Sequence, residues 1–425
     1  MIAAGNQEHT PRRATTEAKP RAGTLRLAIV TSHPIQYNAP AFRALAAVSG
    51  LDVRVFYEWE GPRDTVDPEF GRTISWDVPL FDGYDYVFVP NVSRDPGSHS
   101  FSGIDNPDLV GQLSAWRPDV LLVYGWSFRS HLRVLRTFRG KLPILFRGDS
   151  TLVDESGFPR TLARRALLKW IYRHVDIALY TGTRNREYFR AHGLRDDQLT
   201  WAPHAVDNDY FSARADERDA RAGAWRSELG IPPGDTVFLF AAKLVPRKDP
   251  ATLLAAFLAL RRTAPDCGAH LIFAGEGELL GSLRGASQGR SDVHFIGFRN
   301  QSEMPVVYRL GDVNVLPSRV GETWGLSINE AMACGRAGIV SDRVGCGIDL
   351  IRPNQTGLIF RNRDRDDLEK MLERLGSQRE HVVSMGRRAK LLIEDWSIPA
   401  YTSVVSAVAR AAGEAHATRA RSVTK

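Results

Sequence analysis

The sequence predicts an α/β fold in which two doubly wound parallel-sheet domains face each other across a cleft. A chain of 425 residues is too long for a single hydrophobic core. Short apolar runs alternate with helical segments, which is typical of a parallel sheet covered on both faces. A charged, turn-rich connection at residues 202–235 interrupts this alternation, which then begins again. The restart indicates a second domain.

Apolar patterning gives the order of elements in the first half. Buried strands are expected at residues 25–32, 51–59, 118–125, 142–148 and 176–182. Helices are expected at residues 129–138 and 155–175, and another one after the two prolines that follow the first strand. Residues 60–105 are rich in Gly, Pro, Asp and aromatic residues, and we expect an irregular excursion there.

The second half repeats the pattern. Strands are expected at residues 236–243, 269–274, 292–298, 312–318, 336–342 and 356–360, and helices at 249–265, 304–311 and 325–335. Along the whole chain we expect a disordered tail at 1–24, an N-terminal domain at 25–205, a C-terminal domain at 206–390, a helix at 391–414 that crosses back to the first domain, and a second disordered tail at 415–425.

Composition and charge narrow the classes of function. The net charge of +7 suits anionic partners such as phosphorylated small molecules or lipid headgroups, whereas no zinc-finger spacing, RNA-binding aromatic motif or basic heptad region points to nucleic acid. Three cysteines without a CxxC pair argue against a disulfide framework or a zinc site and favour a reducing cytosol. No apolar run approaches the roughly 18 residues of a membrane span. We therefore expect a cytoplasmic protein.

A basic stretch at residues 160–174 leaves peripheral membrane contact open. It combines the basic residues Arg160, Arg164, Arg165, Lys169 and Arg173 with the apolar residues Leu167, Trp170 and Ile171. This mixture suits contact with anionic lipid at the inner face of a membrane. An ordinary covering helix with one buried stripe has the same pattern, and that interpretation is slightly favoured.

Open parallel sheets bind ligands at the carboxyl ends of their strands, so the loops after the strands hold the candidate site. Lys243 and Lys248 stand in a Pro-containing turn after the strand at 236–243. Two ammonium groups there suit a diphosphate, although a solvated turn has the same composition. The Gly-rich stretch at 273–279 is as consistent with a tight turn as with phosphate binding.

Two glutamates, Glu322 and Glu330, have seven residues between them. A helix is expected to begin at Gly325 or Leu326, and the unpaired N–H groups of a helix N-terminus form an anion site. Because a carboxylate accepts hydrogen bonds from paired hydroxyls, the set matches a sugar, a diphosphate and a ribose in that order. Taken alone, each glutamate is better explained as a loop charge or a partner of the helix dipole.

Together these motifs resemble glycosyltransferase family 4, the group 1 retaining transferases of GT-B fold. The matching stretches are "APHAVDNDYF" (202–211), "AAKLVPRKDP" (241–250), "LIFAGEGEL" (271–279), "VHFIGFRNQSEMPVVYRLGDVNVLPS" (293–318), "GETWGLSINEAMACGRAGIVSD" (321–342) and "TGLIF" (356–360). The resemblance covers most of residues 200–376, while the first half is similar mainly in layout. It implies two Rossmann-like domains, the N-terminal one on the acceptor side and the C-terminal one binding a nucleotide-sugar.

The resemblance also implies a role for each motif residue. Glu322 would contact hydroxyls of the donor sugar, and Glu330 would take the ribose hydroxyls. The N–H groups of Gly325 and Leu326 would bind the distal phosphate. The same loop supplies two further substrate-binding residues, Gly321 and Trp324.

Outside that loop, Lys243 and Lys248 would neutralise the diphosphate. The family more often has Arg at the position of Lys243, and a Lys keeps the charge but loses the bidentate fork. Phe298 and Arg299 would lie by the nucleobase, mostly through their backbone.

The first half departs from the family pattern. Many relatives have a His near the reacting sugar where this chain reads "LFRGDST", so Arg147 or Asp149 takes that place and the sequence does not decide between them. Arg147 would stabilise phosphate or hydroxyl oxygens, and Asp149 could accept a hydroxyl proton. His33, at a strand end that faces the cleft, either contacts phosphate or acceptor or caps a turn.

The resulting hypothesis is a retaining glycosyltransferase that moves a sugar from a nucleoside-diphosphate donor to a hydroxyl, in polysaccharide or glycoconjugate biosynthesis. UDP or GDP is the expected nucleotide, and the acceptor a glycan, a glycolipid or a small molecule. The resemblance implies no essential metal, and no other cofactor is expected. The alternatives are a nucleotide-sugar epimerase of the same fold and a non-catalytic nucleotide-sugar-binding subunit.

Overall fold

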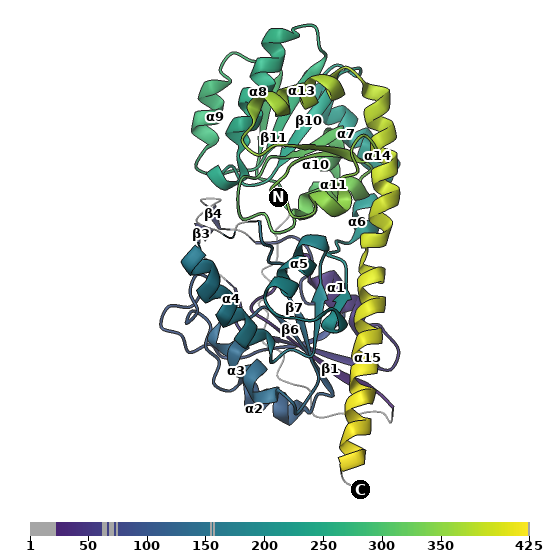
Figure 1. The fold of residues 1–425 in the computed structure, drawn as a ribbon. Helices are drawn as coiled ribbons and strands as arrows, with labels where there is room; N and C mark the ends of the chain where they lie inside the picture. The colour runs from purple at the N-terminus through teal and green to yellow at the C-terminus, as the bar shows by residue number, and fades with distance from the viewer. Residues whose placement is uncertain are drawn as a thin grey trace.

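The computed structural model describes residues 23–61, 66–67, 72–73, 75–153, 155 and 158–423, with side chains left out at 66–67, 72–73, 158–160 and 423. The expected tail at 1–24 lies almost wholly outside this range. Two α/β domains lie one beyond the other, and the C-terminal helices run along one side of both (Figure 1). This arrangement confirms the predicted fold class.

The first domain is built on a seven-stranded sheet in the order β5-β2-β1-β6-β7-β8-β9. The strands are β1 (Leu25–Thr31), β2 (Leu51–Tyr57), β5 (Asp85–Phe88), β6 (Val120–Tyr124), β7 (Ile144–Arg147), β8 (Ile177–Tyr180) and β9 (Leu199–Trp201). All of their pairings are parallel. The aliphatic strands β1 and β6 are buried along most of their length because helices cover both faces of the sheet.

Five α-helices of the described chain belong to this domain. They are α1 (Ala39–Ala46), α2 (Leu109–Trp116), α3 (Arg129–Phe138), α4 (Phe158–Tyr172) and α5 (Thr183–Ala191), with a short 3-10 helix η1 (Asp196–Gln198) before β9. The segment at 60–105, expected to be irregular, supplies the edge strand β5 and a two-stranded antiparallel ribbon of β3 (Val66–Asp67) and β4 (Arg72–Thr73). Aromatic residues that suggested an excursion also suit a pleated edge strand.

The second domain has a six-stranded parallel sheet in the order β12-β11-β10-β13-β14-β15. Its strands are β10 (Thr236–Ala241), β11 (Ala269–Ala274), β12 (Val293–Gly297), β13 (Val313–Leu316), β14 (Ala337–Ser341) and β15 (Gly357–Phe360). The covering helices are α7 (Ala215–Glu228), α8 (Pro250–Thr263), α9 (Leu280–Ala286), α10 (Met304–Leu310), α11 (Leu326–Ala333), α12 (Gly347–Leu350), α13 (Arg365–Gly376) and α14 (Arg379–Ile393). Two apolar clusters fill the space between the sheet and these helices.

The chain passes between the domains twice. The first passage follows β9 and leads through α6 (Asn208–Ser212) into α7. The second follows α14 through a 3-10 turn, η3 (Glu394–Trp396), into α15 (Ile398–Val423), which packs on α1, β1 and β6 of the first domain. Figure 1 shows α14 and α15 as one yellow column beside both domains. The last helix therefore holds the two domains together.

Two expectations about irregular segments were wrong. The connection at 202–235 contains helix α7, and the expected tail at 415–425 continues α15 as helix to Val423. Both segments are rich in Ala and Arg, which are strong helix formers, and both lack proline within the helix. Their charge suggested loops, but helix propensity does not require an apolar stripe.

The strand order places the candidate site. In the second sheet the chain moves from β10 outward to β12 and then returns to β13 on the other side of β10. In open α/β sheets, ligands bind at the carboxyl ends of the strands where the order reverses. The loops after β10 and β13 meet at this point, and they are the loops that hold Lys248 and Glu322.

Candidate active site

Glu322 and Lys248 form the centre of the candidate site. Lys248 ends the 3-10 turn η2 (Pro246–Lys248) after β10, and its ammonium contacts Oε2 of Glu322. Ser318 donates a second hydrogen bond to the same oxygen, with Oγ and Oε2 2.8 Å apart. The Lys248 and Glu322 side chains are 15% and 11% exposed, so both are largely buried and hold each other in place. The predicted pairing of these two loops is therefore present.

Helix α11 begins at the same place. Its N-cap, Gly325, has φ of +108°, a left-handed conformation that side chains rarely adopt. A Cβ there would stand 2.8 Å from the Leu316 side chain and 3.0 Å from that of Val344. Gly325 thus lets α11 start at Leu326 in close contact with β13, and the positive end of the helix lies beside Glu322.

Glu330 lies on α11 and is held by two donors. Tyr308 donates from its hydroxyl to Oε2 at 2.5 Å, and Gln301 donates from Nε2 to Oε1 at 3.3 Å. Burial raises the pKa of Glu330 to about 7, and the two hydrogen bonds partly oppose this shift. Tyr308 and Gln301 were not identified from the sequence, because α10 and its preceding turn reach Glu330 only through tertiary packing.

The Gly-rich stretch after β11 supports the loop of Lys243. The N–H of Leu244 donates to the carbonyl of Glu276 at 2.8 Å. A Cβ on Gly275 would lie 2.0 Å from the Ala242 carbonyl oxygen, and one on Gly277 would lie 2.6 Å from that of Leu244. These glycines therefore serve the close approach of two loops, which is the tight-turn interpretation.

The loop after β12 differs from the expectation in one respect. The Arg299 guanidinium donates to the Ile296 carbonyl and to Glu303, and it stacks 4.8 Å from the ring of Trp225. Its side chain is thus committed to the protein. The N–H of Phe298 faces Oε1 of Glu276 at 3.5 Å. A nucleobase contact here stays a prediction that rests on the backbone of the loop.

Trp324 belongs to the junction of the domains. Its ring is 3% exposed, and its Nε1 donates to Oδ1 of Asn329 at 2.9 Å. Asn329 in turn donates to the carbonyl of His204 at 2.8 Å, and Trp324 packs against Trp396 with ring centroids 4.9 Å apart. The Trp324 ring therefore joins the second domain to both crossing segments, and a substrate contact of this residue stays a prediction. Gly321, in contrast, is exposed with φ of +71°.

Arg147 also belongs to the junction, which corrects its expected catalytic position. The side chain is 6% exposed and donates to the Ala202 carbonyl at 3.0 Å and the Pro203 carbonyl at 2.9 Å. Its guanidinium lies 4.8 Å from the ring of Tyr401 on α15. Arg147 thus fastens both chain crossings to β7, and both of its terminal nitrogens donate to backbone carbonyls.

Asp149 lies two residues further on, and it does reach the candidate site. Its Oδ2 accepts a hydrogen bond from Oγ1 of Thr323 at 2.9 Å. Thr323 follows Glu322 directly, so Asp149 touches the loop that holds the sugar-binding candidate. Of the two candidates for the place of the family's His, Asp149 is the one at the cleft.

Two histidines flank the junction. His33, after β1, contacts Oγ of Ser32 at 3.0 Å and the ring of Trp59, and burial lowers its pKa. His204 lies between the rings of Tyr37 and Trp324, and burial together with the charge of Arg147 lowers its pKa to about 3. In the sequence, the stretch around His204 is recognisable only as a family motif, and the packing role of His204 depends on the folded structure.

Several polar contacts bridge the domains at the rim of the cleft. Thr183 donates from its N–H and from Oγ1 to Asp349, at 3.0 and 2.5 Å. Arg184 donates to the Asp342 carbonyl at 2.8 Å. On another side, Ser302 donates to Asp77. Ser302 and Asp342 stand in family motifs, but nothing in those motifs indicates that the two residues bridge the domains, so only the folded arrangement reveals these contacts.

The grouping of metal-ligating side chains and the apolar character of the helices bear on metal binding and membrane insertion. Within the part of the chain that the structure describes, no three His, Cys, Asp or Glu residues are grouped so that they could hold a metal ion. Within the same part, no helix combines the length and the apolar character that crossing a membrane requires.

The second domain is the part of the chain that matches a known family. Residues 222–392 match the family described as Glycosyl transferases group 1. A D-inositol 3-phosphate glycosyltransferase of Nocardia farcinica is 26% identical over 347 residues, which span 75% of this chain and 74% of that protein. A GDP-mannose-dependent alpha-(1-6)-phosphatidylinositol monomannoside mannosyltransferase of Mycobacterium tuberculosis is 29% identical over 250 residues, 56% of this chain and 62% of that protein.

Solved structures share the fold across both domains. An α,α-trehalose 6-phosphate synthase of Burkholderia multivorans superposes with a TM-score of 0.69 at 16% identity, covering 92% of this chain and 100% of the other. The Anabaena protein HepE, solved with UDP, superposes with a TM-score of 0.68 at 14% identity, covering 91% of this chain and 100% of the other.

The two facing parallel-sheet domains and the matched second domain define an enzyme that transfers glycosyl groups, built on the GT-B fold. The match of residues 222–392 and the relatives named as glycosyltransferases support a group 1 glycosyltransferase. This confirms the predicted recognition, fold and enzyme class.

Proposed function

We propose that the protein transfers a sugar, with retention at the anomeric carbon, from a nucleoside-diphosphate-sugar to a hydroxyl group. The observation that supports this most directly is the meeting of Lys248, Glu322 and the start of α11 at the reversal point of the second sheet. Positive charge for a diphosphate and a carboxylate for sugar hydroxyls stand there side by side. Glu330 lies further along α11, where the ribose of such a donor would end.

The proposed chemistry depends on stabilising the negative charge of the leaving diphosphate. As the bond between the anomeric carbon and the phosphate oxygen breaks, negative charge develops on the diphosphate, and Lys243, Lys248 and the N–H groups at the start of α11 would stabilise it. The acceptor hydroxyl attacks from the side of the departing phosphate, and its proton passes to a phosphate oxygen. The products are the glycoside and a nucleoside diphosphate. No resident metal or other cofactor is part of this proposal.

Donor binding would rearrange the central ion pair. The Lys248 ammonium contacts Glu322 in the free protein. A diphosphate carries more negative charge than one carboxylate, so Lys248 would turn to it and release Glu322 toward the sugar hydroxyls. Closing the cleft would then exclude water and limit hydrolysis of the donor. Asp149, already in contact with the Glu322 loop, is the candidate for orienting the acceptor hydroxyl.

The relatives suggest which substrates to test first. One is named for D-inositol 3-phosphate and another for GDP-mannose and a phosphatidylinositol mannoside, and one neighbour in fold was solved with UDP. We therefore propose UDP- and GDP-sugars as donors and hydroxyl acceptors of the inositol or glycoconjugate class, in polysaccharide or glycoconjugate assembly. A thermal-shift screen with UDP, GDP, ADP and dTDP would identify the nucleotide.

The decisive experiment compares Lys248→Ala and Glu330→Gln with the parent protein in a donor-turnover assay. Loss of one charged contact to the leaving group typically lowers the rate by about 10²–10³-fold. Lys370→Ala is a matched control, since Lys370 is an exposed lysine on α13. If both site variants turn over donor at the parent rate, the assignment of this site is wrong.

The epimerase alternative needs no acceptor. Incubation with the donor alone, followed by product analysis, separates it from transfer. An epimerised donor formed without acceptor would replace the present proposal, whereas glycoside formed only with acceptor supports it.

Peripheral membrane contact through helix α4 remains a separate proposal. In the structure Ile171 is buried and Trp170 packs against an apolar cluster of the first domain, as in an ordinary covering helix. Leu162 and Leu167 are exposed, at 61% and 47%, next to the basic residues of α4. Pelleting with vesicles of anionic lipid at low and high salt would test this surface. Absence of binding at low salt would remove it.

A further inference from the structure

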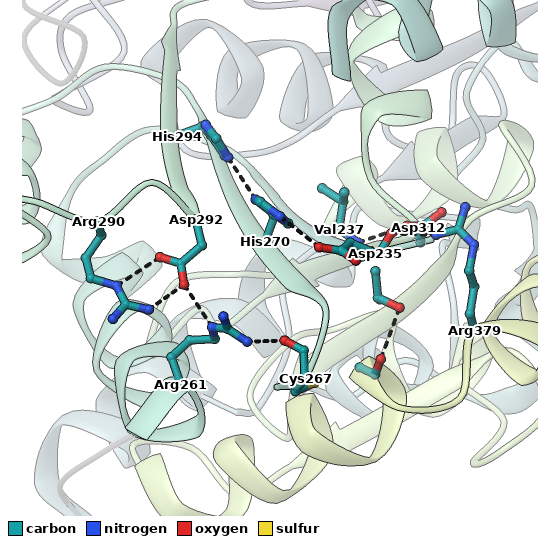
Figure 2. A network of polar contacts seen from close by, with 12 residues as sticks. Asp235, Val237, Arg261, Cys267, His270, Arg290, Asp292, His294, Asp312 and Arg379 are labelled. Atoms are coloured by element: carbon teal, nitrogen blue, oxygen red, sulfur yellow. Dashed lines mark hydrogen bonds and ion pairs between the residues drawn. The ribbon is translucent and has the colours of Figure 1, made fainter. Parts of the chain in front are cut away.

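The edge of the second sheet opposite the candidate active site holds a second set of charged groups. Asp312 stands directly before β13 and Arg336 directly before β14, at the amino ends of these strands. Figure 2 shows this edge, with Asp312 and Arg379 beyond the contacting pair His270 and His294. The proposed transfer reaction uses none of these residues.

A cavity opens at this edge between the sheet and helix α14. Its volume is about 160 Å³, and it is lined by Asp312, Gly335, Arg336, Val382, Val383 and Arg387. One buried water requires only roughly 10–15 Å³ measured in this way. The cavity therefore has room for a small polyatomic ion.

Asp312, the one acidic residue in the cavity lining, contacts three other residues. Oδ1 of Asp312 lies 3.0 Å from Nη2 of Arg226. Oδ2 accepts from the N–H of Val237 at 2.8 Å and from Nη1 of Arg379 at 3.3 Å (Figure 2). Asp312 is therefore held by Arg226, Val237 and Arg379, and within the described part of the chain it makes no hydrogen bond to either arginine that lines the cavity.

Those two arginines lack full compensation. Arg336 donates from Nη2 to Asp219 at 2.8 Å, but its buried Nε has no hydrogen-bond partner. Asp219 is shared with Arg309, whose Nε lies 3.4 Å away. Arg387 makes no hydrogen bond or ion pair with the described part of the chain. Burial lowers the pKa of Arg336, and the charges of Asp219 and Asp312 partly oppose this shift.

The local charge balance points in the same direction. The cavity lining holds two arginines, Arg336 and Arg387, and one aspartate, Asp312, so it carries one net positive charge. A buried N–H without a partner and uncompensated charge are both costly. A guanidinium matches the oxygens of a tetrahedral oxyanion in a bidentate manner.

We propose that this cavity is a binding site for a phosphate-type oxyanion, inorganic phosphate or a phosphate monoester, held by Arg336 and Arg387. The site is distinct from the donor site, because it lies at the amino ends of the strands and the donor site lies at their carboxyl ends. The ligand would fill the missing hydrogen bond of Arg336 and neutralise Arg387. The valines of α14 form the apolar wall of the cavity.

The test is a thermal-unfolding titration with inorganic phosphate at constant ionic strength, using chloride as the reference anion. A ligand that binds only the native state raises the melting temperature as its concentration increases. Because phosphate would also enter the donor site, every titration uses Lys248→Ala as the background. Arg387→Gln is then compared with Arg374→Gln, since Arg374 is an exposed arginine on the neighbouring helix α13.

The proposal expects phosphate to stabilise the background protein and Arg374→Gln equally, with an apparent Kd at least tenfold weaker in Arg387→Gln. Arg387 is exposed, so its substitution is expected to leave folding intact. Equal stabilisation of all three proteins, or an equal effect of chloride, would overturn the site. The result does not depend on transfer activity, so it can fail while the proposed function stands.

Discussion

The cleft-facing edges of the two sheets use their charged residues in opposite ways. In the second domain, Lys248 and Glu322 pair with each other through side chains that keep some exposure, so a ligand can replace one partner. In the first domain, Arg147 turns inward to two backbone carbonyls of the crossing chain. A charged residue at the carboxyl end of a strand is therefore not by itself a site residue, because its partners decide whether it remains available.

Glu322→Gln tests the available side of this contrast. Glu322→Gln keeps the shape of the side chain but removes the charge that would hold sugar hydroxyls. Because a hydrogen bond to a charged group contributes about 1.5–3 kcal/mol, we expect kcat to fall by roughly 10- to 150-fold. Steady-state kinetics with the preferred donor would measure this fall. Glu373→Gln, on the exposed face of α13, is the control, and equal kcat in both variants would contradict the role.

Arg147→Ala should affect folding more than chemistry. The substitution leaves the carbonyls of Ala202 and Pro203 without their donors, and we expect about 1.5–3 kcal/mol less stability. Urea unfolding would measure the loss. A variant as stable as the parent but without activity would restore Arg147 to the catalytic set.

Asp149→Ala tests a first-domain residue that contacts the Glu322 loop, unlike Arg147. It removes one exposed hydrogen bond to Thr323, so we expect at most about 1 kcal/mol of lost stability. Turnover should fall while binding of the nucleotide alone is unchanged. Weaker nucleotide binding with an unchanged rate of transfer would assign Asp149 to the donor instead of the acceptor.

A separate effect concerns pH and Glu330. Its pKa rises from an ordinary value of 4.5 to about 7 in the fold, so the native state holds this proton more tightly than the unfolded chain. The contribution of Glu330 to stability is therefore fully present below about pH 4.5 and declines as the pH rises through 7. Glu330→Gln lacks this term, while the shifts of the buried histidines are common to both proteins. Unfolding free energies measured from pH 4.5 to 8 should show the difference between parent and variant changing in that direction, and a constant difference would contradict it.

The second domain was largely predictable because its information is local. Strands such as β10 are continuous apolar runs, and the loops that hold Lys248 and Glu322 each follow a strand in a recognisable order of motifs. Parallel strands bring their carboxyl ends to one edge, so sequence order and the reversal rule were enough to predict that these loops meet.

The sequence by itself determined the fold class, the enzyme class and the residues that gather at the reversal point. Only the tertiary structure decided that Trp324 and Arg147 face the junction, that Asp149 reaches the Glu322 loop, and that Tyr308 holds Glu330. The physical reason is the length scale of each interaction. Strand and helix patterns arise from neighbouring residues, whereas the availability of a polar side chain depends on partners that are distant in sequence.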